Sequence, residues 1–171
     1  MSKIEALPLT RKILGLLPLL LLASCSPGQE HFGGGPATFA SNGERIYFSG
    51  TSASGQAIIA SGGSSMMSRH RQMHGGGCAV CHGAEREGKR LWPQFWIKAP
   101  ALTAEALFSD KLEHEGHTDH GNYDTESLRM AIAAGVNPKG EPFDAAMPRW
   151  TMSPADLEDL VTYLRQTAVP D

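Results

Sequence analysis

Two cysteines and a histidine near the middle of the chain carry the clearest chemical signal. Cys78 and Cys81 are three positions apart, and His82 follows the second cysteine directly. This spacing is that of a c-type haem attachment site. Each thiol can add across a vinyl group of the porphyrin to form a thioether, and the imidazole is then placed to bind the iron. The pentapeptide therefore predicts one covalently bound haem c per chain.

Two other interpretations of the cysteine pair fit the sequence less well. A redox-active Cys-x-x-Cys pair belongs in a thioredoxin-like βαβ setting, and no such pattern surrounds Cys78 and Cys81. Half of a zinc site would require a second pair of Cys or His ligands at zinc-finger spacing. The third cysteine, Cys25, lies far away at the end of an N-terminal leader.

That leader has the organisation of a secretory signal peptide. Lys3, Arg11 and Lys12 make its start positive, and an apolar run follows over residues 13–23. The run is too short to cross a bilayer comfortably as a helix. It fits the hydrophobic region of a signal peptide, to which we assign residues 1–24.

The leader ends in Leu22-Ala23-Ser24-Cys25, which resembles the lipobox of bacterial lipoproteins. By that resemblance Cys25 becomes the acylated first residue of the mature protein, and several acyl chains would anchor it stably to a membrane. Ser26, rather than Asp, follows Cys25, which resembles the outer-membrane sorting pattern of Gram-negative lipoproteins. We therefore expect a lipoprotein on the periplasmic face of a bacterial membrane, the outer membrane in preference to the inner. A plain signal peptide with an incidental cysteine is the alternative.

The charge of the exported chain bears on its partners. The chain has 171 residues and a formal net charge of −3; without the leader, 12 basic and 17 acidic residues give about −5. Such a surface argues against nucleic acid as a partner. It favours redox proteins, a donor and an acceptor, that present a basic docking face.

Glycine and serine are concentrated between the leader and the haem motif. Residues 25–36 are typical of a flexible tether, and residues 37–168 are predicted to form one domain. Within it, residues 49–77 are a Gly/Ser/Met-rich insertion without clear periodicity. Its stretch Met66–His74 offers thioethers and imidazoles, which are ligands suited to copper. We favour a surface loop that covers the haem edge, with a copper-handling function as the alternative.

Helices are predicted at both ends of the domain. In the first, over residues 38–48, Gly43 and Tyr47 share one face. Another helix begins at Asp124 or Thr125 and stops at Gly135. The last helix has an N-cap and a first-turn proline at Ser153-Pro154. Its core-facing stripe is then Leu157, Leu160, Val161 and Leu164.

Taken together, these features resemble a class I cytochrome c over about residues 38–166. In that family an N-terminal helix with a glycine and an aromatic residue closely crosses the C-terminal helix. That pattern is matched by Gly43, Tyr47, Leu160 and Tyr163. The resemblance implies an all-α cytochrome c fold, with three to five short helices around one covalently bound haem and long loops. It also implies an electron carrier, rather than an enzyme, whose iron cycles between the ferrous and ferric states.

The resemblance also implies the ligands of the iron. His82 is the proximal ligand, and Pro100-Ala101-Leu102 matches a Pro-x-Leu whose proline carbonyl orients that imidazole. Met147, followed by Pro148, matches the sixth-ligand methionine. The family usually has only a few residues between the first helix and the haem motif, so the insertion at 49–77 is a departure.

Met147 is one of several methionines in the chain. Met130 falls inside a predicted helix, and Met152 lacks the following proline that biases Met147 towards an extended backbone. A haem enzyme or gas sensor in which Met147 is displaced is an alternative function. His114, His117 and His120 follow the haem motif; they suit a solvated loop, or a divalent metal site as the alternative.

Overall fold

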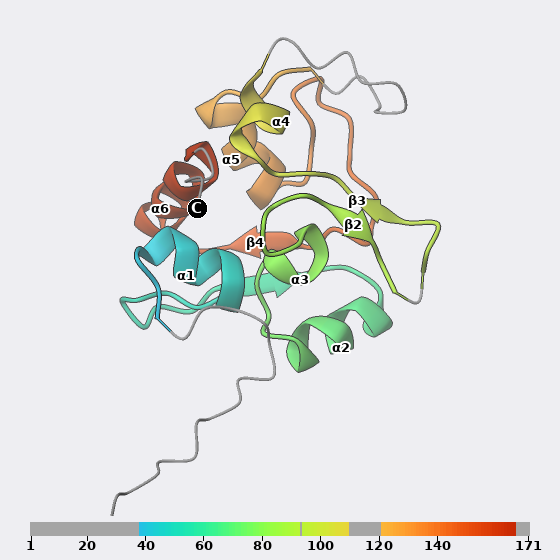
Figure 1. Ribbon diagram of the computed structural model, residues 1–171, viewed down its shortest axis with the longest axis horizontal. Coiled ribbons are helices and arrows are strands. Elements are labelled where there is room, and N and C mark those ends of the chain that lie inside the picture. The colour runs from blue at the N-terminus through green and yellow to red at the C-terminus, as the bar shows by residue number, and fades with distance from the viewer. Residues whose placement is uncertain (1–37, 93, 110–120, 167–171) are drawn as a thin grey trace, which may run out of the picture.

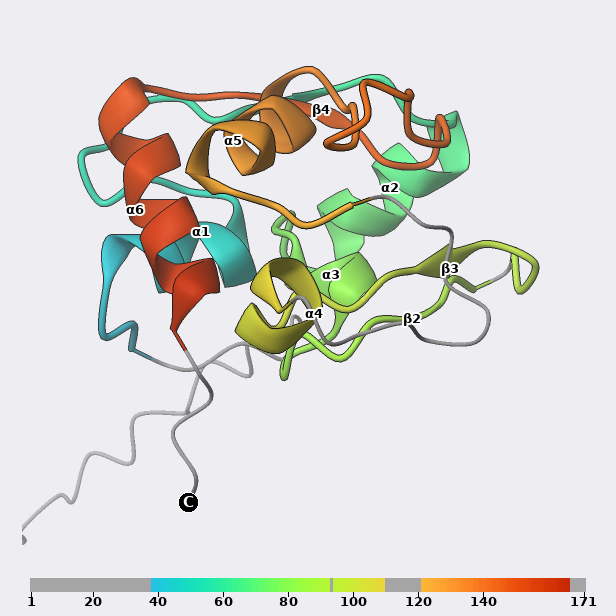
Figure 2. The ribbon, with the colours of Figure 1, turned by 90° about the horizontal axis from the view of Figure 1, so that it is seen from above.

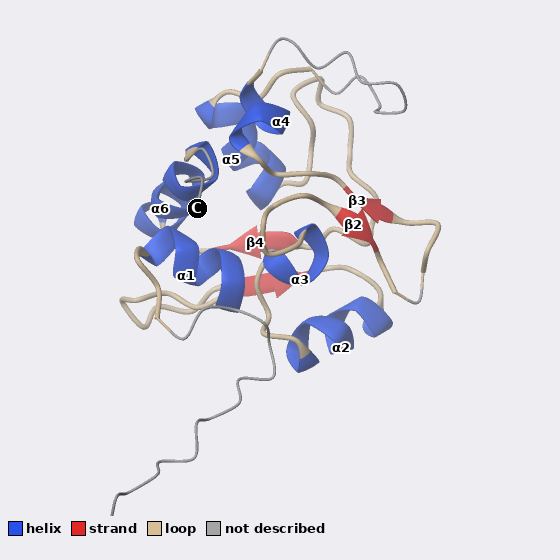
Figure 3. Ribbon diagram, in the orientation of Figure 1, coloured by secondary structure: helices blue, strands red, loops and turns tan. Residues whose placement is uncertain are grey.

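The computed structural model describes residues 38–92, 94–109 and 121–166. In these ranges six helices dominate, joined by long loops (Figures 1 and 3). The helices are α1 Asn42–Ser49, α2 Ser65–Met73, α3 Ala79–His82, α4 Ala104–Phe108, α5 Thr125–Ala133 and α6 Pro154–Arg165. Two antiparallel strand pairs are β1 Ile59–Ser61 with β4 Arg149–Thr151, and β2 Lys89–Arg90 with β3 Lys98–Ala99. None of the helices described has the length and apolarity needed to span a membrane.

The first and last helices cross at a glycine. A Cβ on Gly43 would lie 2.1 Å from the carbonyl oxygen of Asp159, so only a residue without a side chain permits this approach. Tyr47 is fully buried on the same face of α1, and Leu160 of α6 is 1% exposed. Figure 2 shows the two helices side by side, as does Figure 1. The crossing predicted from the sequence is therefore confirmed.

Helix boundaries follow from side-chain caps. Helix α1 begins at Asn42 rather than Thr38, because the Ser41 hydroxyl accepts a hydrogen bond from the Glu44 N–H. The predicted start at residue 38 is therefore wrong by four positions. Asp124 caps α5 through a capping box, and Ser153 caps α6, as predicted.

The insertion at 49–77 contains more regular structure than its composition indicates. Strand β1 pairs with β4, with Ile59 opposite Thr151, and Ser64 caps α2. A three-residue strand has no periodic signal of its own, and its partner lies far along the sequence. Helix α2 is polar and buries only Met67 and Arg71, so its few apolar residues do not form a pattern that predicts a helix.

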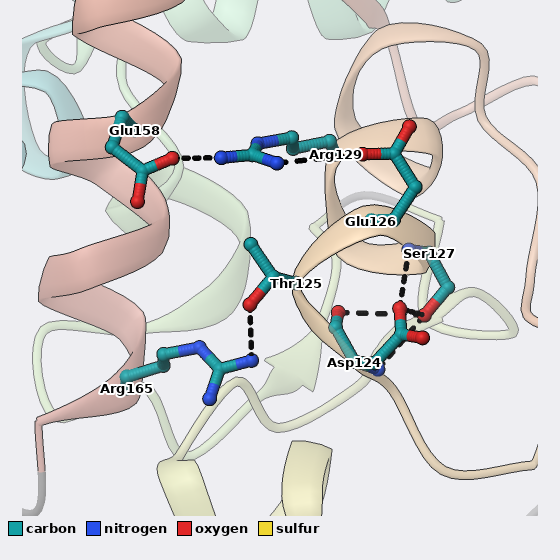
Figure 4. A network of polar contacts seen from close by, with 7 residues as sticks. All are labelled: Asp124, Thr125, Glu126, Ser127, Arg129, Glu158 and Arg165. Carbon is teal, nitrogen blue, oxygen red and sulfur yellow. Dashed lines mark hydrogen bonds and ion pairs between the residues drawn. The ribbon is translucent and has the colours of Figure 1, made fainter.

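A surface network joins α5 to α6 (Figure 4). Arg129 on α5 forms an ion pair with Glu158 on α6 and a second, at 3.4 Å, with Glu126 on its own helix. Arg165 near the end of α6 donates a hydrogen bond to the Thr125 hydroxyl. These polar contacts hold the outer sides of the two helices together around an apolar interior.

The apolar interior has a main cluster and a smaller one. The smaller cluster comprises Met67, Leu91 and Ala99, against which Cys81 and Ile97 pack. The main cluster comprises Ile46, Tyr47, Leu107, Leu128, Ile132, Trp150, Leu160, Val161 and Leu164. Helices supply most of these residues, and the described strands are two or three residues long. The all-α fold class is confirmed. The described residues form six helices rather than the three to five predicted, because the insertion contributes α2.

Candidate haem-attachment site

One helical turn positions the cysteine and histidine side chains. Cys78 is the N-cap of α3, and the backbone N–H of His82 donates a 2.9 Å hydrogen bond to the Cys78 carbonyl. Residues three and four positions apart lie on the same side of a helix, so Cys81 and His82 both lie on the side of Cys78. Both cysteines are free and half-buried.

Burial favours the neutral form of both thiols. Burial raises the pKa of Cys78 to about 12. Burial also raises the pKa of Cys81, against the opposing effects of Arg71 and Lys89. A redox-active cysteine pair requires a lowered thiol pKa, so this environment argues against a thioredoxin-like function.

His82 has the environment of a metal ligand. Its side chain is buried, and its Nδ1 lies 2.8 Å from the carbonyl oxygen of Pro100. A carbonyl can only accept, so Nδ1 is the donor and Nε2 keeps its lone pair. Burial lowers the pKa of His82 more than the Pro100 hydrogen bond raises it, which favours the neutral imidazole. Metal-bound histidines are oriented by a hydrogen bond of this kind.

The chain after His82 is fixed by contacts that deliver Pro100. Gly88 passes so close to the Pro100 backbone that a Cβ there would lie 2.6 Å from its carbonyl carbon. The Leu102 N–H donates a 2.7 Å hydrogen bond to the Arg86 carbonyl. The buried Arg86 guanidinium in turn donates to the Tyr163 carbonyl at 3.1 Å, at the end of α6. Sequence reasoning missed Arg86, because no motif distinguishes a buried arginine that binds carbonyls.

Met147 lies in the loop between α5 and β4. It is half-buried and packs against the main cluster, as does Cys78. Arg149 donates hydrogen bonds to the carbonyls of Met147 and Phe143, and its side chain lies where a Cβ on Gly135 would be. Arg149 thus holds the loop that carries Met147. This contact was also missed in the sequence, which indicated Gly135 as a helix stop alone.

The competing methionines occupy different positions. Met130 is 45% exposed on α5, which excludes it from the interior. Met152 is half-buried and packs against the main cluster, as Met147 does. The distinguishing feature of Met147 is its fixed backbone, held by Arg149 and followed by the buried Pro148.

These donors fit haem c. Two neutral thiols, Cys78 and Cys81, are free to form thioethers, and His82 offers an unprotonated Nε2. When bound, the haem supplies an iron that accepts and releases one electron. Within the described ranges no group of three or more His, Cys, Asp or Glu side chains forms an alternative metal site.

Cys25 and the histidines at 114, 117 and 120 fall outside the described residues. In α2, Met66 and Met73 are 50% and 63% exposed. The rings of His70 and His74 have their centroids 4.4 Å apart.

Comparison with known proteins gives a single finding. The family model for Cytochrome c matches residues 53–168, which is more than half of the chain and includes the attachment turn and the Met147 loop. No curated protein and no solved structure matches the chain.

Proposed function

Because the chain belongs to the cytochrome c family, we propose that it is an exported, lipid-anchored electron carrier with its iron between His82 and Met147. The family binds haem c covalently through two cysteines, so Cys78 and Cys81 hold the haem. Cys25 is the proposed lipid attachment point.

The observation that carries the proposal is the hydrogen bond between His82 and Pro100. It uses Nδ1 of a buried imidazole and leaves the lone pair of Nε2 available to a metal, in the same helical turn as two free thiols. A buried histidine with a purely structural role is expected to hydrogen-bond through both ring nitrogens. His82 has a described hydrogen bond at Nδ1 alone, and both neighbouring cysteines are free. A proximal ligand requires that arrangement.

A His–Met pair suits a carrier better than a catalyst. With both His82 and Met147 bound, the iron would offer no open position to a substrate. A thioether is a weaker donor to ferric iron than a second imidazole, so Met147 raises the reduction potential. The apolar cluster around Met147 and Cys78 works in the same direction.

The role of Met147 as a ligand is tested with Met147→Ala and the matched control Met152→Ala, which removes a methionine of similar burial. Met147→Ala should lower the reduction potential and allow the reduced protein to bind carbon monoxide. Met152→Ala should leave the haem spectrum nearly unchanged. The reverse result would assign the ligand to Met152. Wild-type protein that binds carbon monoxide readily would favour the gas-sensor or enzyme alternative.

The anchor and the partners are tested separately. Mass spectrometry of the mature protein should find acyl chains on Cys25, and Cys25→Ser should release the protein from the membrane. An unmodified N-terminus elsewhere would exclude the lipoprotein.

Partners with a basic docking face should exchange electrons more slowly as ionic strength rises, because the chain is acidic. Rates that do not depend on salt would exclude that docking mode.

A second candidate function, copper binding on α2, is favoured by the His70–His74 pair. Met66 lies one turn before His70, and Met73 shares the exposed side of the helix. These soft and borderline ligands suit copper(I). Titration of the haem-loaded protein with copper(I) should show binding that His70→Gln abolishes and Arg69→Gln, an exposed change on the same helix, preserves. Equal binding by wild type and His70→Gln would exclude the site.

A further inference from the structure

Helix α2 buries an arginine that has no counter-charge among the described residues. Arg71 is 7% exposed. Its Nη2 donates a 3.4 Å hydrogen bond to the Ser68 hydroxyl, whereas Nη1 is buried without a hydrogen-bond partner. The ion pairs found in those ranges belong to another arginine, Arg129. An unpaired buried charge is strongly unfavourable, so this site requires an anion.

The surroundings of Arg71 place it near the loop that carries Met147. A Cβ added to Gly63 would lie 3.4 Å from Nη1 of Arg71. The same Cβ would lie 3.8 Å from the carbonyl oxygen of Ala145 and 3.9 Å from that of Ala146. Those two residues directly precede Met147.

The other buried residue of α2 faces the same way. Met67 lies one turn before Arg71, on the same side of the helix, and packs with Leu91 and Ala99. Cys81 packs against this cluster. Figures 1 and 2 both show α2 next to α3. The inner side of α2 therefore faces the turn that carries the haem-binding cysteines.

We propose that Arg71 is the counter-ion of a haem propionate, and that residues 49–77 thereby form one wall of the haem pocket. The inference rests on the proposed function, because it requires the haem held by Cys78 and Cys81. The carboxylates of haem are its propionates, and they are the anions that it brings to a site between Cys81 and the Met147 loop. A guanidinium is a planar fork that matches a carboxylate with two hydrogen bonds.

This pairing has a measurable electronic consequence. Ferric haem carries one more positive charge than ferrous haem, so an unneutralised propionate nearby stabilises the ferric state. Removal of Arg71 should therefore lower the reduction potential. Lysine at this position would retain the charge but lose the two-point geometry.

The experiment compares Arg71→Gln and Arg71→Lys with Arg69→Gln, in which the same charge is removed from an exposed position of α2. Reduction potential and the propionate bending mode in resonance Raman spectra are measured on purified holoprotein. Arg71→Gln should lower the potential and shift the propionate mode. Arg71→Lys should retain most of the potential and shift the mode less. Arg69→Gln should change neither.

Other outcomes would overturn the assignment. An unchanged propionate mode in Arg71→Gln, with haem still attached, would mean that a different anion pairs with Arg71. If the reduction potential falls equally in Arg71→Gln and Arg69→Gln, the fall reflects the loss of any positive charge on α2, and the specific pairing is contradicted. If Arg71→Gln yields no holoprotein, Arg71→Lys decides: a shifted propionate mode supports the pairing, and an unchanged mode contradicts it. Wild-type protein without covalent haem would instead contradict the proposed function.

Discussion

The α1–α6 crossing and helix α2 both border the haem-attachment turn, yet they differ in whether their buried polar groups have partners within the protein. At the crossing, apolar side chains fill the interface, and the buried Asp156 accepts hydrogen bonds from Asn42, Ser52 and Ser153. In α2, the two buried residues are Met67 and Arg71, and Arg71 lacks a partner. At the crossing, protein atoms alone satisfy the buried carboxylate of Asp156. In α2, the partner of Arg71 is the haem propionate that we propose. The crossing thus stabilises the fold, and α2 is proposed to supply one wall of the haem pocket.

The largest effect is expected at the crossing. Gly43→Ala would place a Cβ 2.1 Å from the Asp159 carbonyl oxygen and 2.8 Å from the Tyr163 Cβ. Because the closest atom belongs to a helix backbone, the helices must separate, at a cost of about 3 kcal/mol or more. Chemical denaturation of the holoprotein measures this loss.

Gly55→Ala is the control, since no atom lies within 4 Å of the added Cβ and only its positive φ opposes the change. It should cost about 1 kcal/mol. Equal losses for the two variants would show that the helices do not cross as closely as described.

A smaller and more local effect is expected in α2. Met67→Ala removes a side chain that is 1% exposed, and large-to-small changes at buried sites cost about 2 kcal/mol or more. Because α2 has few buried contacts, we expect it to open separately from the crossing. Hydrogen exchange should accelerate in residues 65–73 and stay unchanged in α1 and α6. Equal acceleration in all three helices would make α2 part of the same cooperative unit.

The smallest effect concerns Asp156 and depends on pH. Burial alone would raise its pKa, but hydrogen bonds from Ser52, Asn42 and Ser153 outweigh burial and lower the pKa below 3.8. The carboxylate therefore stabilises the fold fully above the pKa of the unfolded chain, and this contribution is lost as pH falls through the lower folded pKa. Asp156→Asn should cost about 1 kcal/mol at neutral pH and flatten the decline of stability in acid. A variant with the wild-type acid profile would contradict this role.

The two regions also differ in how well the sequence predicted them. The last helix was predictable because its stripe of leucines and a valine is a local pattern, and the close approach of the first helix to it followed from the family resemblance. The haem turn was predictable from a local pattern, since Cys78, Cys81 and His82 fall within five consecutive residues. The arrangement of Pro100 beneath His82 followed from the family resemblance, and the 2.8 Å contact agrees with it.

The missed features depend on contacts between distant segments. The β1–β4 pairing joins residues about ninety positions apart, and Arg149 acts through carbonyl oxygens that any sequence would provide. Arg71 is one of two arginines in α2, and the other, Arg69, is exposed. Sequence patterns indicate which face of a helix is apolar. They do not indicate which charged side chain is buried by contacts between distant segments.

The central claim is that iron is held between His82 and Met147 in a covalently attached haem. Near-infrared magnetic circular dichroism of the oxidised wild-type protein tests it most directly, because a sulfur-to-iron charge-transfer band distinguishes thioether from imidazole ligation. We predict a low-spin histidine–methionine signature that disappears in Met147→Ala and persists in Met152→Ala. A bis-imidazole or high-spin signature in the wild-type protein would contradict the claim.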